Sequence, residues 1–496
     1  MKRRPLIIQK FGGTSVGTIE RMRNVAQIVA AEYRSGHDVV VVASAMAGET
    51  NRLIELAQLA SVDPEPRELD CLLTTGEQTS VALLSMILNQ MGIPARSILG
   101  FQMGMHTDTA HTKARIVALD RARFESSLEK RIVLVAAGFQ GIAPDGNLTT
   151  LGRGGSDTTA VAIAAELGAD FCDIYTDVDG VYTADPNVCP DARRLDRISY
   201  EEMLELASTG AKVLQIRSVE LGMKYNVPLR VRSSFGGGPG TLVVKEEASM
   251  EDVLVAGVAC DKNEAKISLR AVADRPGMAA LIFTPLAEAN IVVDMIIQNV
   301  ALDGTTDVTF TVPRADLKQA LAVMNRASSA LGIERIESDD RIAKISVVGV
   351  GMRSHAGVAT TMFRALSDEG INIQMISTSE IKISGVIEAK DADRAQRALH
   401  TAFGLARAPS ELESSKPKSS QPKSDRRLGK PTRAGKVANA GKPSKRGKPS
   451  NSSKAAELST PATMTTQERA KTSRKTTRKT SGKASAPTIR AKRGRA

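Results

Sequence analysis

A lysine stands two positions before a pair of glycines near the start of the chain, in the segment QKFGGTSVGT of residues 9–18. A β-rich run precedes the glycines and a helical pattern begins near Ile19, so Gly12 and Gly13 are predicted to lie in a strand-to-helix turn. Glycines let backbone N–H groups approach an anion closely, and the ammonium group of Lys10 can add a point charge. The lysine precedes the glycines, unlike in a Walker motif, and a tight structural turn would explain the pattern equally well.

A second glycine pair opens another predicted helix, in the segment LGRGGSDTTA of residues 151–160. Arg153 precedes the pair, and Ser156 and Asp157 fall in the first helical turn. A helix cap, with an acidic residue favoured by the helix dipole, would explain Ser156 and Asp157. It leaves Arg153 unexplained, and the guanidinium fork of an arginine suits the carboxylate of a small substrate.

Polar side chains also follow other predicted strands. Asp177, Asp179 and Asp185 lie in IYTDVDGVYTADP, residues 174–186, just after a strand. Open α/β sheets bind ligands beyond the carboxyl ends of their strands, although a surface Asp-Gly turn is an equal explanation. Further candidates, each of which could be only a helix cap, are Ser44, Thr50 and Glu77. The five histidines are scattered and form no catalytic constellation.

The composition is that of a large chain without tryptophan. At 496 residues, about three domains are expected, at roughly 150 residues each. The four cysteines lie far apart with no CxxC pair, which indicates reduced thiols and no zinc site. After MKRRP the apolar run is shorter than that of a secretory signal, and no stretch reaches the ~20 apolar residues of a membrane span. We therefore expect a cytoplasmic protein that does not enter a membrane.

Short β-rich runs alternate with longer helical patterns up to about residue 245. Strands are predicted in LIIQKF, DVVVVASAM, RIVLVAAGFQG, DFCDIYTDV and LRVRSSF, and helices in residues 20–33, 78–90 and 158–167. Several strands are apolar throughout, as expected when both faces of a sheet are buried. The pattern predicts an α/β fold with a mostly parallel sheet and helices on both faces.

The residues from 250 to 406 repeat themselves. Residues of one type recur at an offset of 80, as in the pairs Gly277 and Gly357, Phe283 and Phe363, Ile291 and Ile371, and Met295 and Met375. Matching chemistry at one offset over about twenty positions is hard to obtain by chance. Each unit shows a strand, a glycine turn, a helix and a strand, then a further strand and helix. The pattern predicts a small ferredoxin-like βαββαβ module that occurs twice.

The residues from 411 to 496 carry a net charge of +19, whereas the rest of the chain carries −7. They are rich in Ser, Pro, Lys and Ala and contain no Phe, Tyr or Trp. Such a segment cannot bury enough apolar area to offset the entropy lost on ordering, so we expect residues 408–496 to be a disordered basic tail. A flexible cationic chain attracts nucleic-acid phosphates, but it lacks aromatics for base stacking, and a solvated extension without a partner is the simpler alternative.

Taken together and in this order, the segments resemble the aspartate kinases of the amino-acid kinase family. The matching segments are KFGGTSV, TTGEQ, GFQG, GRGGSDTTA, YTDVDGVYTADP and GAKVLQIRSVE. The repeated modules look like the tandem ACT domains that bind feedback amino acids in this family. The resemblance implies an amino-acid kinase catalytic domain at residues 1–248 and ACT domains at 250–336 and 337–407. The tail at 408–496 lies outside it.

The resemblance implies phosphoryl transfer from ATP to the β-carboxylate of L-aspartate, with Mg²⁺ held by the ATP phosphates and no metal ligands from the protein alone. This is the first step of lysine, threonine and methionine biosynthesis. The implied catalytic residues are Lys10 and Asp157. The implied ATP-binding residues are Lys10, Phe11, Gly12, Gly13, Thr176, Asp177, Tyr182, Asp185 and Lys212. The implied substrate-binding residues are Ser44, Thr50, Glu77, Arg153 and Ser156, with Arg153 on the α-carboxylate and Glu77 on the α-ammonium.

The resemblance also implies feedback inhibition by lysine, threonine or both. The implied effector-binding residues of the first module are Asp274, Met295, Gln298 and Asn299. The second module has MRSHAG where the first has ADRPG, which favours one effector-binding module and one structural module. The family also implies a homo-oligomer through the ACT domains, or an assembly with a shorter subunit that starts at Met250. A linker methionine is the alternative for Met250.

One residue departs from the family pattern. Asn187 follows TADP, where the family commonly has an arginine near the nucleotide phosphates. We therefore expect weaker ATP affinity than in relatives unless Arg193 or Arg194 supplies the missing charge.

Two other functions compete with this interpretation. Another amino-acid kinase, such as one acting on glutamate, is disfavoured by KFGGTSV and the ACT pair. A non-catalytic amino-acid sensor is disfavoured by the presence of Lys10, Arg153 and Asp157. The enzyme interpretation predicts that the cationic ends of Lys10 and Arg153 converge on one cavity.

Overall fold

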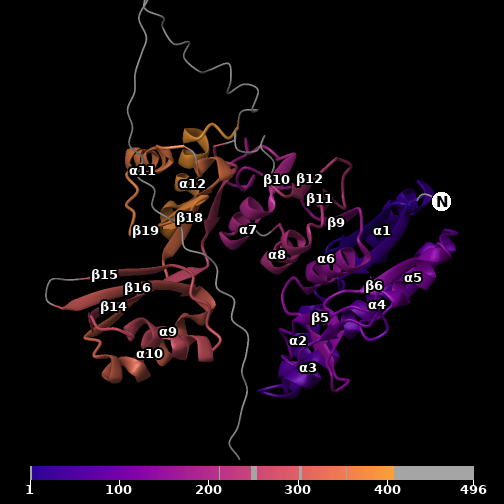
Figure 1. Ribbon diagram of the computed structural model, residues 1–496, viewed down its shortest axis with the longest axis horizontal. Helices are drawn as coiled ribbons and strands as arrows, with labels where there is room; N and C mark the ends of the chain where they lie inside the picture. The colour runs from indigo at the N-terminus through magenta and orange to yellow at the C-terminus, as the bar shows by residue number, and fades with distance from the viewer. Residues whose placement is uncertain (1–2, 212, 247–253, 301–303, 354, 407–496) are drawn as a thin grey trace, which may run out of the picture. The chain divides into compact units, whose positions relative to one another are not determined.

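The computed structural model describes residues 3–211, 213–246, 254–300, 304–353 and 355–406 (Figure 1). These residues belong to one compact unit that spans Met1–Lys418. Of the residues with predicted roles, Lys212 and Met250 lie outside the described residues, as does the segment 408–496.

An eight-stranded sheet organises the first half of the chain, in the order β10-β12-β11-β9-β1-β2-β6-β3. Its strands are β1 (Leu6–Phe11), β2 (Asp38–Ala43), β3 (Ala95–Ile98), β6 (Val133–Ala137), β9 (Phe171–Thr176), β10 (Arg197–Ser199), β11 (Leu229–Ser233) and β12 (Thr241–Val244). All neighbouring strands run parallel except β11 and β12. The central strands are buried, which explains their apolar sequences. The predicted mostly parallel sheet is confirmed.

Helices cover both faces of this sheet (Figure 1). One face carries α1 (Ile19–Arg34) and α4 (Thr75–Gln90), and the other carries α5 (Ala122–Glu129), α6 (Gly155–Leu167), α7 (Tyr200–Ser208) and α8 (Ile216–Tyr225). Alternate residues of β1 belong to different cores, because successive side chains of a strand point to opposite faces. Ile8 packs in the core beneath α6, and Phe11 packs in the core beneath α1 and α4.

A smaller sheet with the order β5-β4-β7-β8 and two further helices complete this part of the chain. Their bounds are α2 (Glu49–Ala60), α3 (Pro66–Leu73), β4 (His106–Thr107), β5 (Ile116–Ala118), β7 (Gln140–Ile142) and β8 (Leu148–Thr150). The helix α3 packs against β8, which ends directly before the second glycine segment.

The first repeated module forms the sheet β15-β16-β14-β17 with two helices. In chain order its elements are β14 (Glu264–Ala273), α9 (Met278–Glu288), β15 (Ile296–Val300), β16 (Thr305–Pro313), α10 (Leu317–Leu331) and β17 (Arg335–Asp339). This is the predicted βαββαβ order.

The second module forms the sheet β13-β18-β20-β19. Its elements are β18 (Ile342–Val348), α11 (Val358–Asp368), β19 (Met375–Thr378), β20 (Lys382–Glu388) and α12 (Ala392–Ala402), together with β13 (Gly257–Asp261). The strand β13 precedes the first module in the chain but pairs antiparallel with β18. Val258 packs in the core of the second module and Ala259 in the core of the large sheet, so apolar residues on both faces hold β13 there. The domain boundary at residue 336 stays a prediction.

The helices α9 and α11 show the internal repeat directly. Their bounds differ by 80 residues at both ends, which matches the offset in the sequence. Each helix begins after a glycine in the left-handed region, Gly277 at φ 92° and Gly357 at φ 103°, a conformation that glycine adopts without strain. Ile282 and Met362, at equivalent positions, are both fully buried.

One helical stretch of the described residues, Pro66–Gln90, is long and apolar enough to cross a membrane, with a mean hydropathy of 1.3. It consists of α3 and α4, and half of its most apolar window is buried inside the protein. It also contains the buried carboxylates of Asp70 and Glu77. These features are typical of a core helix in a folded domain.

Candidate active site

Lys10 and Asp157 form an ion pair where β1 meets α6. Lys10 Nζ lies 2.5 Å from Asp157 Oδ1, and the two side chains are 12% and 9% exposed. Lys10 shares a face of β1 with Ile8, and α6 packs on that face. The fold therefore joins the two glycine segments through opposite charges.

The turn after β1 passes close to the loop after β2. The N–H of Ala47 donates to the carbonyl of Gly13 at 3.1 Å, and a β-carbon at Gly13 would lie 2.9 Å from the carbonyl oxygen of Ala45. Only glycine permits this approach. The N–H of Gly12 donates to the carbonyl of Tyr175 at 3.3 Å, so this group, expected to approach an anion, is used within the fold.

The second glycine segment forms the N-terminus of α6. Gly154, at φ 69°, is the cap residue, and no side chain caps the helix. Ser156 and Asp157 lie in the first turn, but neither acts as a cap. Ser156 instead packs against Gly138, where a β-carbon would lie 2.6 Å from Ser156 Oγ. The side-chain cap expected from this alternative is therefore absent, whereas Asp157 lies in the first turn, where the helix dipole favours an acidic residue.

Arg153 precedes this helix cap, and its side chain is exposed. The segment is held by Arg217 of α8, whose Nη1 donates to the carbonyl of Leu151 at 2.6 Å. Its Nη2 donates to the carbonyl of Ala114 at 3.1 Å. Arg153 thus lies on a fixed segment four residues before Asp157. The convergence of the Lys10 and Arg153 cations on one cavity stays a prediction.

Glu77 is a buried carboxylate in the first turn of α4, 3% exposed. Its Oε1 accepts a hydrogen bond from the N–H of Ala45 at 3.0 Å, whereas its Oε2 has no partner among the described residues. Burial raises the pKa of Glu77 to about 7. A buried carboxylate with one free oxygen is suited to bind a cation.

The loop after β2 connects Glu77 to the glycine turn. The N–H of Ser44 donates to the carbonyl of Phe11 at 3.1 Å, and Ala45 is the hydrogen-bond donor to Glu77. Ser44 and Thr50, the latter in the first turn of α2, are both half-buried. The structure therefore connects Ser44 and Glu77 to the segment around the turn after β1, whereas the place of Thr50 in the substrate site stays a prediction.

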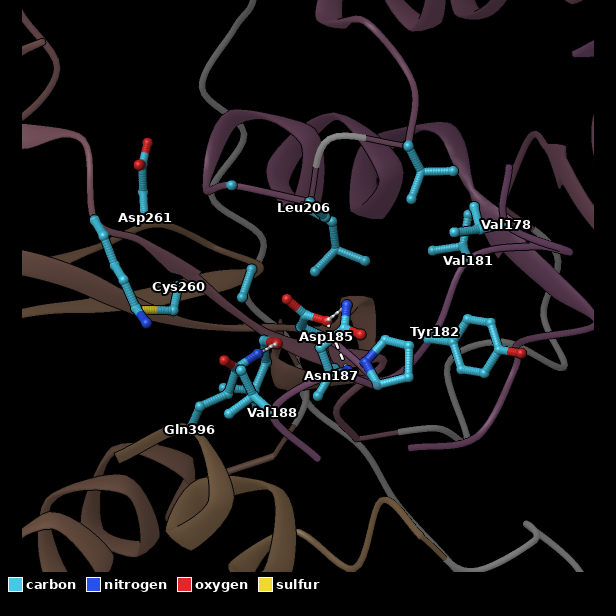
Figure 2. Close-up of a pocket in the computed structure, with 18 of the residues that line it drawn as sticks. Val178, Val181, Tyr182, Asp185, Asn187, Val188, Leu206, Cys260, Asp261 and Gln396 are labelled. Atoms are coloured by element: carbon cyan, nitrogen blue, oxygen red, sulfur yellow. Dashed lines mark hydrogen bonds between the residues drawn. The ribbon is translucent and has the colours of Figure 1, made fainter. Parts of the chain in front are cut away.

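The residues after β9 line a cavity of about 660 Å³ (Figure 2). Four of the predicted ATP-binding residues belong to its lining, namely Thr176, Asp177, Tyr182 and Asp185. Figure 2 shows Tyr182 on one side of the cavity and Cys260 and Asp261 of β13 on the other. Asn187 also belongs to the lining, and its Nδ2 donates to Asp185 Oδ1 at 3.0 Å.

The wall formed by β13 is fixed to the segment after β9. The N–H of Val258 donates to the carbonyl of Thr183 at 2.8 Å, and Thr183 Oγ1 lies 3.0 Å from His400 Nε2 of α12. His400 is 1% exposed, and burial lowers its pKa. A β-carbon at Gly210 would lie 2.5 Å from the carbonyl oxygen of Cys260. Buried contacts therefore hold the two sides of the cavity together.

The two arginines considered as substitutes for the charge missing at Asn187 have other contacts. Arg194 pairs with Asp179 at 3.8 Å and with Asp196 at 3.4 Å. The backbone N–H of Arg193 donates to Thr183 Oγ1 at 3.0 Å, whereas its buried side-chain Nε has no hydrogen-bond partner among the described residues. Neither arginine belongs to the lining of the cavity that contains Asn187.

The predicted effector residues lie on two segments of the first module, the end of β14 and the segment that contains β15. Asp274 is exposed after β14, and Gln298 and Asn299 are exposed on the edge strand β15. Met295 is 5% exposed and packs against Met375 in a small cluster that both modules share. The counterpart of Asp274 in the second module, at residue 354, lies outside the described residues.

Asp70 is a fully buried carboxylate that the sequence interpretation missed. It accepts hydrogen bonds from Thr150 Oγ1 at 2.5 Å and from His111 Nδ1 at 2.8 Å. It also accepts from the N–H of Thr112, at 3.0 Å. Asp70 thus ties α3 to the end of β8, beside the second glycine segment. No local pattern signals this role, because all three donors lie at least forty positions away in the chain.

Within the described part of the chain, no group of three or more His, Cys, Asp and Glu side chains is placed to bind a metal ion.

Comparisons with known proteins place these features in a family. The model of the amino acid kinase family matches residues 5–233, and the model of the ACT domain matches residues 267–327 and 345–403. An aspartokinase of Pseudomonas aeruginosa is 59% identical over 402 residues, which cover 81% of this chain and 98% of that protein. An aspartokinase of Corynebacterium glutamicum is 48% identical over 405 residues, which cover 81% and 96%.

Solved structures show the same similarity. E. coli aspartokinase III in complex with aspartate and ADP superposes with a TM-score of 0.69 at 27% identity, over 80% of this chain and 99% of that one. The complex of the same enzyme with lysine and aspartate gives a TM-score of 0.65 at 27% identity, with the same coverage. The chain therefore belongs to the aspartate kinases of the amino acid kinase family and carries a tandem pair of ACT domains.

Proposed function

We propose that the chain transfers the γ-phosphoryl group of ATP to the β-carboxylate of L-aspartate and forms 4-phospho-L-aspartate. The observation that carries this proposal is the ion pair between Lys10 and Asp157, which joins the turn after β1 to the first turn of α6. The similarity to E. coli aspartokinase III, which was solved with aspartate and ADP, supports both ligands.

The chemistry requires no strong base from the protein. The β-carboxylate of aspartate is ionised at neutral pH, so one of its oxygens attacks the γ-phosphorus directly. The bond from that phosphorus to the bridging oxygen breaks, ADP departs with the electron pair, and no proton is transferred. Catalysis then depends on position and on stabilisation of negative charge. In this proposal Lys10 stabilises the transferred group and Asp157 orients Lys10.

We assign residues to the two charged groups on the α-carbon of L-aspartate by their opposite charge. Arg153 pairs with the α-carboxylate, and the unpartnered oxygen of Glu77 accepts the α-ammonium. Ser44, Thr50 and Ser156 complete the contacts. The burial of Glu77 supports this assignment, because a bound ammonium group would compensate the buried charge.

The nucleotide is assigned to the turn after β1 and to the cavity beyond β9. The residues assigned to it are Lys10, Phe11, Gly12, Gly13, Thr176, Asp177, Tyr182 and Asp185, together with Lys212, which lies outside the described residues. A Mg²⁺ ion bound through the ATP phosphates would supply further neutralisation of their charge. We assign no side chain to it, since the carboxylate of Asp157 is already paired with Lys10.

Replacement of Lys10 tests the proposal. Lys10→Met removes the point charge at nearly constant size, and we expect kcat to fall at least about 100-fold, as when a group that stabilises the transition state is lost. Lys10→Arg keeps a charge opposite buried Asp157 and serves as the folding control. The measurement is ADP release with L-aspartate, with L-glutamate and with no amino acid. In the wild-type chain, turnover with L-glutamate but not with L-aspartate would indicate an amino-acid kinase that acts on glutamate. Binding of ligands without turnover would indicate a non-catalytic amino-acid sensor.

We also propose feedback inhibition by lysine, threonine or both at the first ACT module. The structure of E. coli aspartokinase III in complex with lysine and aspartate, described as its T-state, supports lysine as an effector. Asp274 would bind the effector ammonium, with Met295, Gln298 and Asn299 nearby. Titration of lysine and threonine, singly and together, in the ADP-release assay tests this proposal. A rate that neither amino acid changes would contradict it.

The proposal includes assembly of the chain through its ACT modules and a place in the cytoplasm at the start of lysine, threonine and methionine synthesis. The exposed side chain of Ile296 on the edge strand β15 supports assembly, because unpaired apolar edges favour pairing with another chain. A monomeric molar mass by light scattering would contradict it. Co-expression of a chain that starts at Met250 would test the alternative assembly with a shorter subunit.

A second candidate function concerns the segment 408–496 alone. Its positive charge favours non-specific binding to nucleic acid, with an affinity that falls as salt concentration rises. This role is separate from phosphoryl transfer.

A further inference from the structure

We propose that Lys262, in the turn between β13 and β14, binds the nucleotide in the cavity beyond β9. A residue of the regulatory part of the chain would then belong to the substrate site. The inference rests on the proposed function in one respect, namely that this cavity takes ATP.

The position of the cavity relative to the glycine turn supports a nucleotide as its ligand. The lining begins at Thr176, which follows Tyr175, and the carbonyl of Tyr175 accepts the N–H of Gly12. Ser234 connects the same two segments, because its Oγ lies 2.8 Å from Ser15 Oγ and 3.2 Å from the carbonyl of Thr176. A polyphosphate at Lys10 would therefore continue into the cavity.

The charges of the cavity require a cation. Its lining includes the carboxylates of Asp177, Asp185 and Asp261, which repel a polyanion. Lys262 is the one cationic side chain among the described residues of the lining. Asn187, which also lines the cavity, is uncharged. Lys262 thus supplies the charge that an anionic ligand needs there.

The wall that carries Lys262 is anchored to the catalytic part of the chain. The hydrogen bond from Val258 to Thr183 and the close approach of Cys260 to Gly210 hold β13 in place. Gln396 of α12, which also lines the cavity, holds the strand, because its Nε2 donates to the carbonyl of Val258 at 3.2 Å. The base of the Lys262 side chain therefore has a fixed position beside the cavity.

The ammonium group of Lys262 can still leave its present partner. Lys262 Nζ lies 2.6 Å from Asp393 Oδ1 of α12, and both side chains are 49% exposed. Exposed ion pairs of this kind contribute little to stability. A flexible four-carbon stem lets the ammonium group exchange one anion for another.

Three variants test the inference. For Lys262→Ala we expect the dissociation constant for the magnesium complex of a non-hydrolysable ATP analogue, measured by calorimetry, to rise about tenfold, as for the loss of one charge-assisted contact. The KM for ATP should rise in parallel, while kcat and the KM for aspartate stay within about twofold. Lys262→Arg should retain most of the affinity.

Asp393→Asn is the matched control, because it breaks the same ion pair and leaves the lysine free. We expect it to bind the nucleotide as tightly as the wild-type chain or more tightly. Equal weakening by Lys262→Ala and Asp393→Asn would overturn the inference, since the ion pair would then explain the effect. Unchanged affinity in Lys262→Ala would also overturn it.

The two proposals fail in different ways. Calorimetry measures nucleotide binding without turnover, so a wild-type chain that binds the analogue but does not phosphorylate aspartate would refute only the proposed function. A wild-type chain that binds no nucleotide would refute both.

Discussion

Glu77 carries a buried carboxylate whose charge depends on pH near neutrality. Burial raises its pKa to about 7, so a large fraction is protonated below that pH in the absence of a ligand. A protonated Glu77 cannot pair with the α-ammonium of aspartate. We therefore expect the KM for aspartate to rise about tenfold as the pH falls from 8 to 6, and we expect this dependence to disappear in Glu77→Gln. Initial rates across this pH range provide the measurement.

The same substitution should stabilise the fold at alkaline pH. The pKa of Glu77 is higher in the folded protein, at about 7, than its ordinary value of 4.5, so its contribution to stability is complete below pH 4.5 and is lost as the pH rises through 7. Glutamine is uncharged at all of these pH values, so it avoids this loss of stability, and its side-chain oxygen can still accept the hydrogen bond from the N–H of Ala45. We expect Glu77→Gln to raise Tm by about 4 °C at pH 8 and to leave it unchanged at pH 4. A lower Tm at pH 8 would show that the carboxylate has a stabilising partner.

The position of the first turn of α6 depends on the absence of a side chain at Gly138. A β-carbon there would lie 2.6 Å from Ser156 Oγ and 2.7 Å from Ser156 Cβ, so the first turn of α6 would have to move. That turn carries Asp157. We expect Gly138→Ala to lower kcat/KM at least about tenfold, because small displacements in a catalytic site are costly.

Gly236→Ala is the control for this prediction. No atom lies within 4 Å of a β-carbon at Gly236, and its φ is not in the left-handed region. Steady-state rates and circular-dichroism spectra of both variants provide the measurements. Full activity in Gly138→Ala would show that α6 tolerates the displacement.

The elements also explain what could be predicted from the sequence. The strands β1, β2 and β9 and the helices α1 and α6 were predictable because apolar runs and glycine pairs mark their ends locally. The places of Lys10, Glu77 and Asp157 beside the ends of strands and helices could be inferred from family motifs, whereas their roles stay predictions. The contacts of Asp70 and His400 could not be predicted, because their partners lie more than forty positions away in the chain. The place of Lys262 beside the cavity could not be predicted either, because the residues after β9 that line the same cavity are distant from it in sequence. The pairing of β13 with β18 was missed for the same reason.

The segment 408–496 carries a net positive charge, whereas the rest of the chain is mildly acidic. We expect a chain that ends at residue 408 to keep its kcat and KM, because the site residues described above all lie before residue 407. If the segment binds nucleic acid, the full chain should bind DNA at low salt and the shortened chain should not, since the segment from 411 carries the net charge of +19. Fluorescence anisotropy with a labelled duplex, over a series of salt concentrations, provides the measurement. Equal binding by both chains would exclude the nucleic-acid role.

The pairing of β13 with β18 has a consequence for the order of events during synthesis. Residues 257–261 leave the ribosome before their partner strand, and the first module lies between them in the chain. At rates of roughly 5–20 residues per second, the nascent strand waits several seconds with an unpaired edge. The pocket wall that β13 provides therefore gains its partner strand only after residue 348 has been translated.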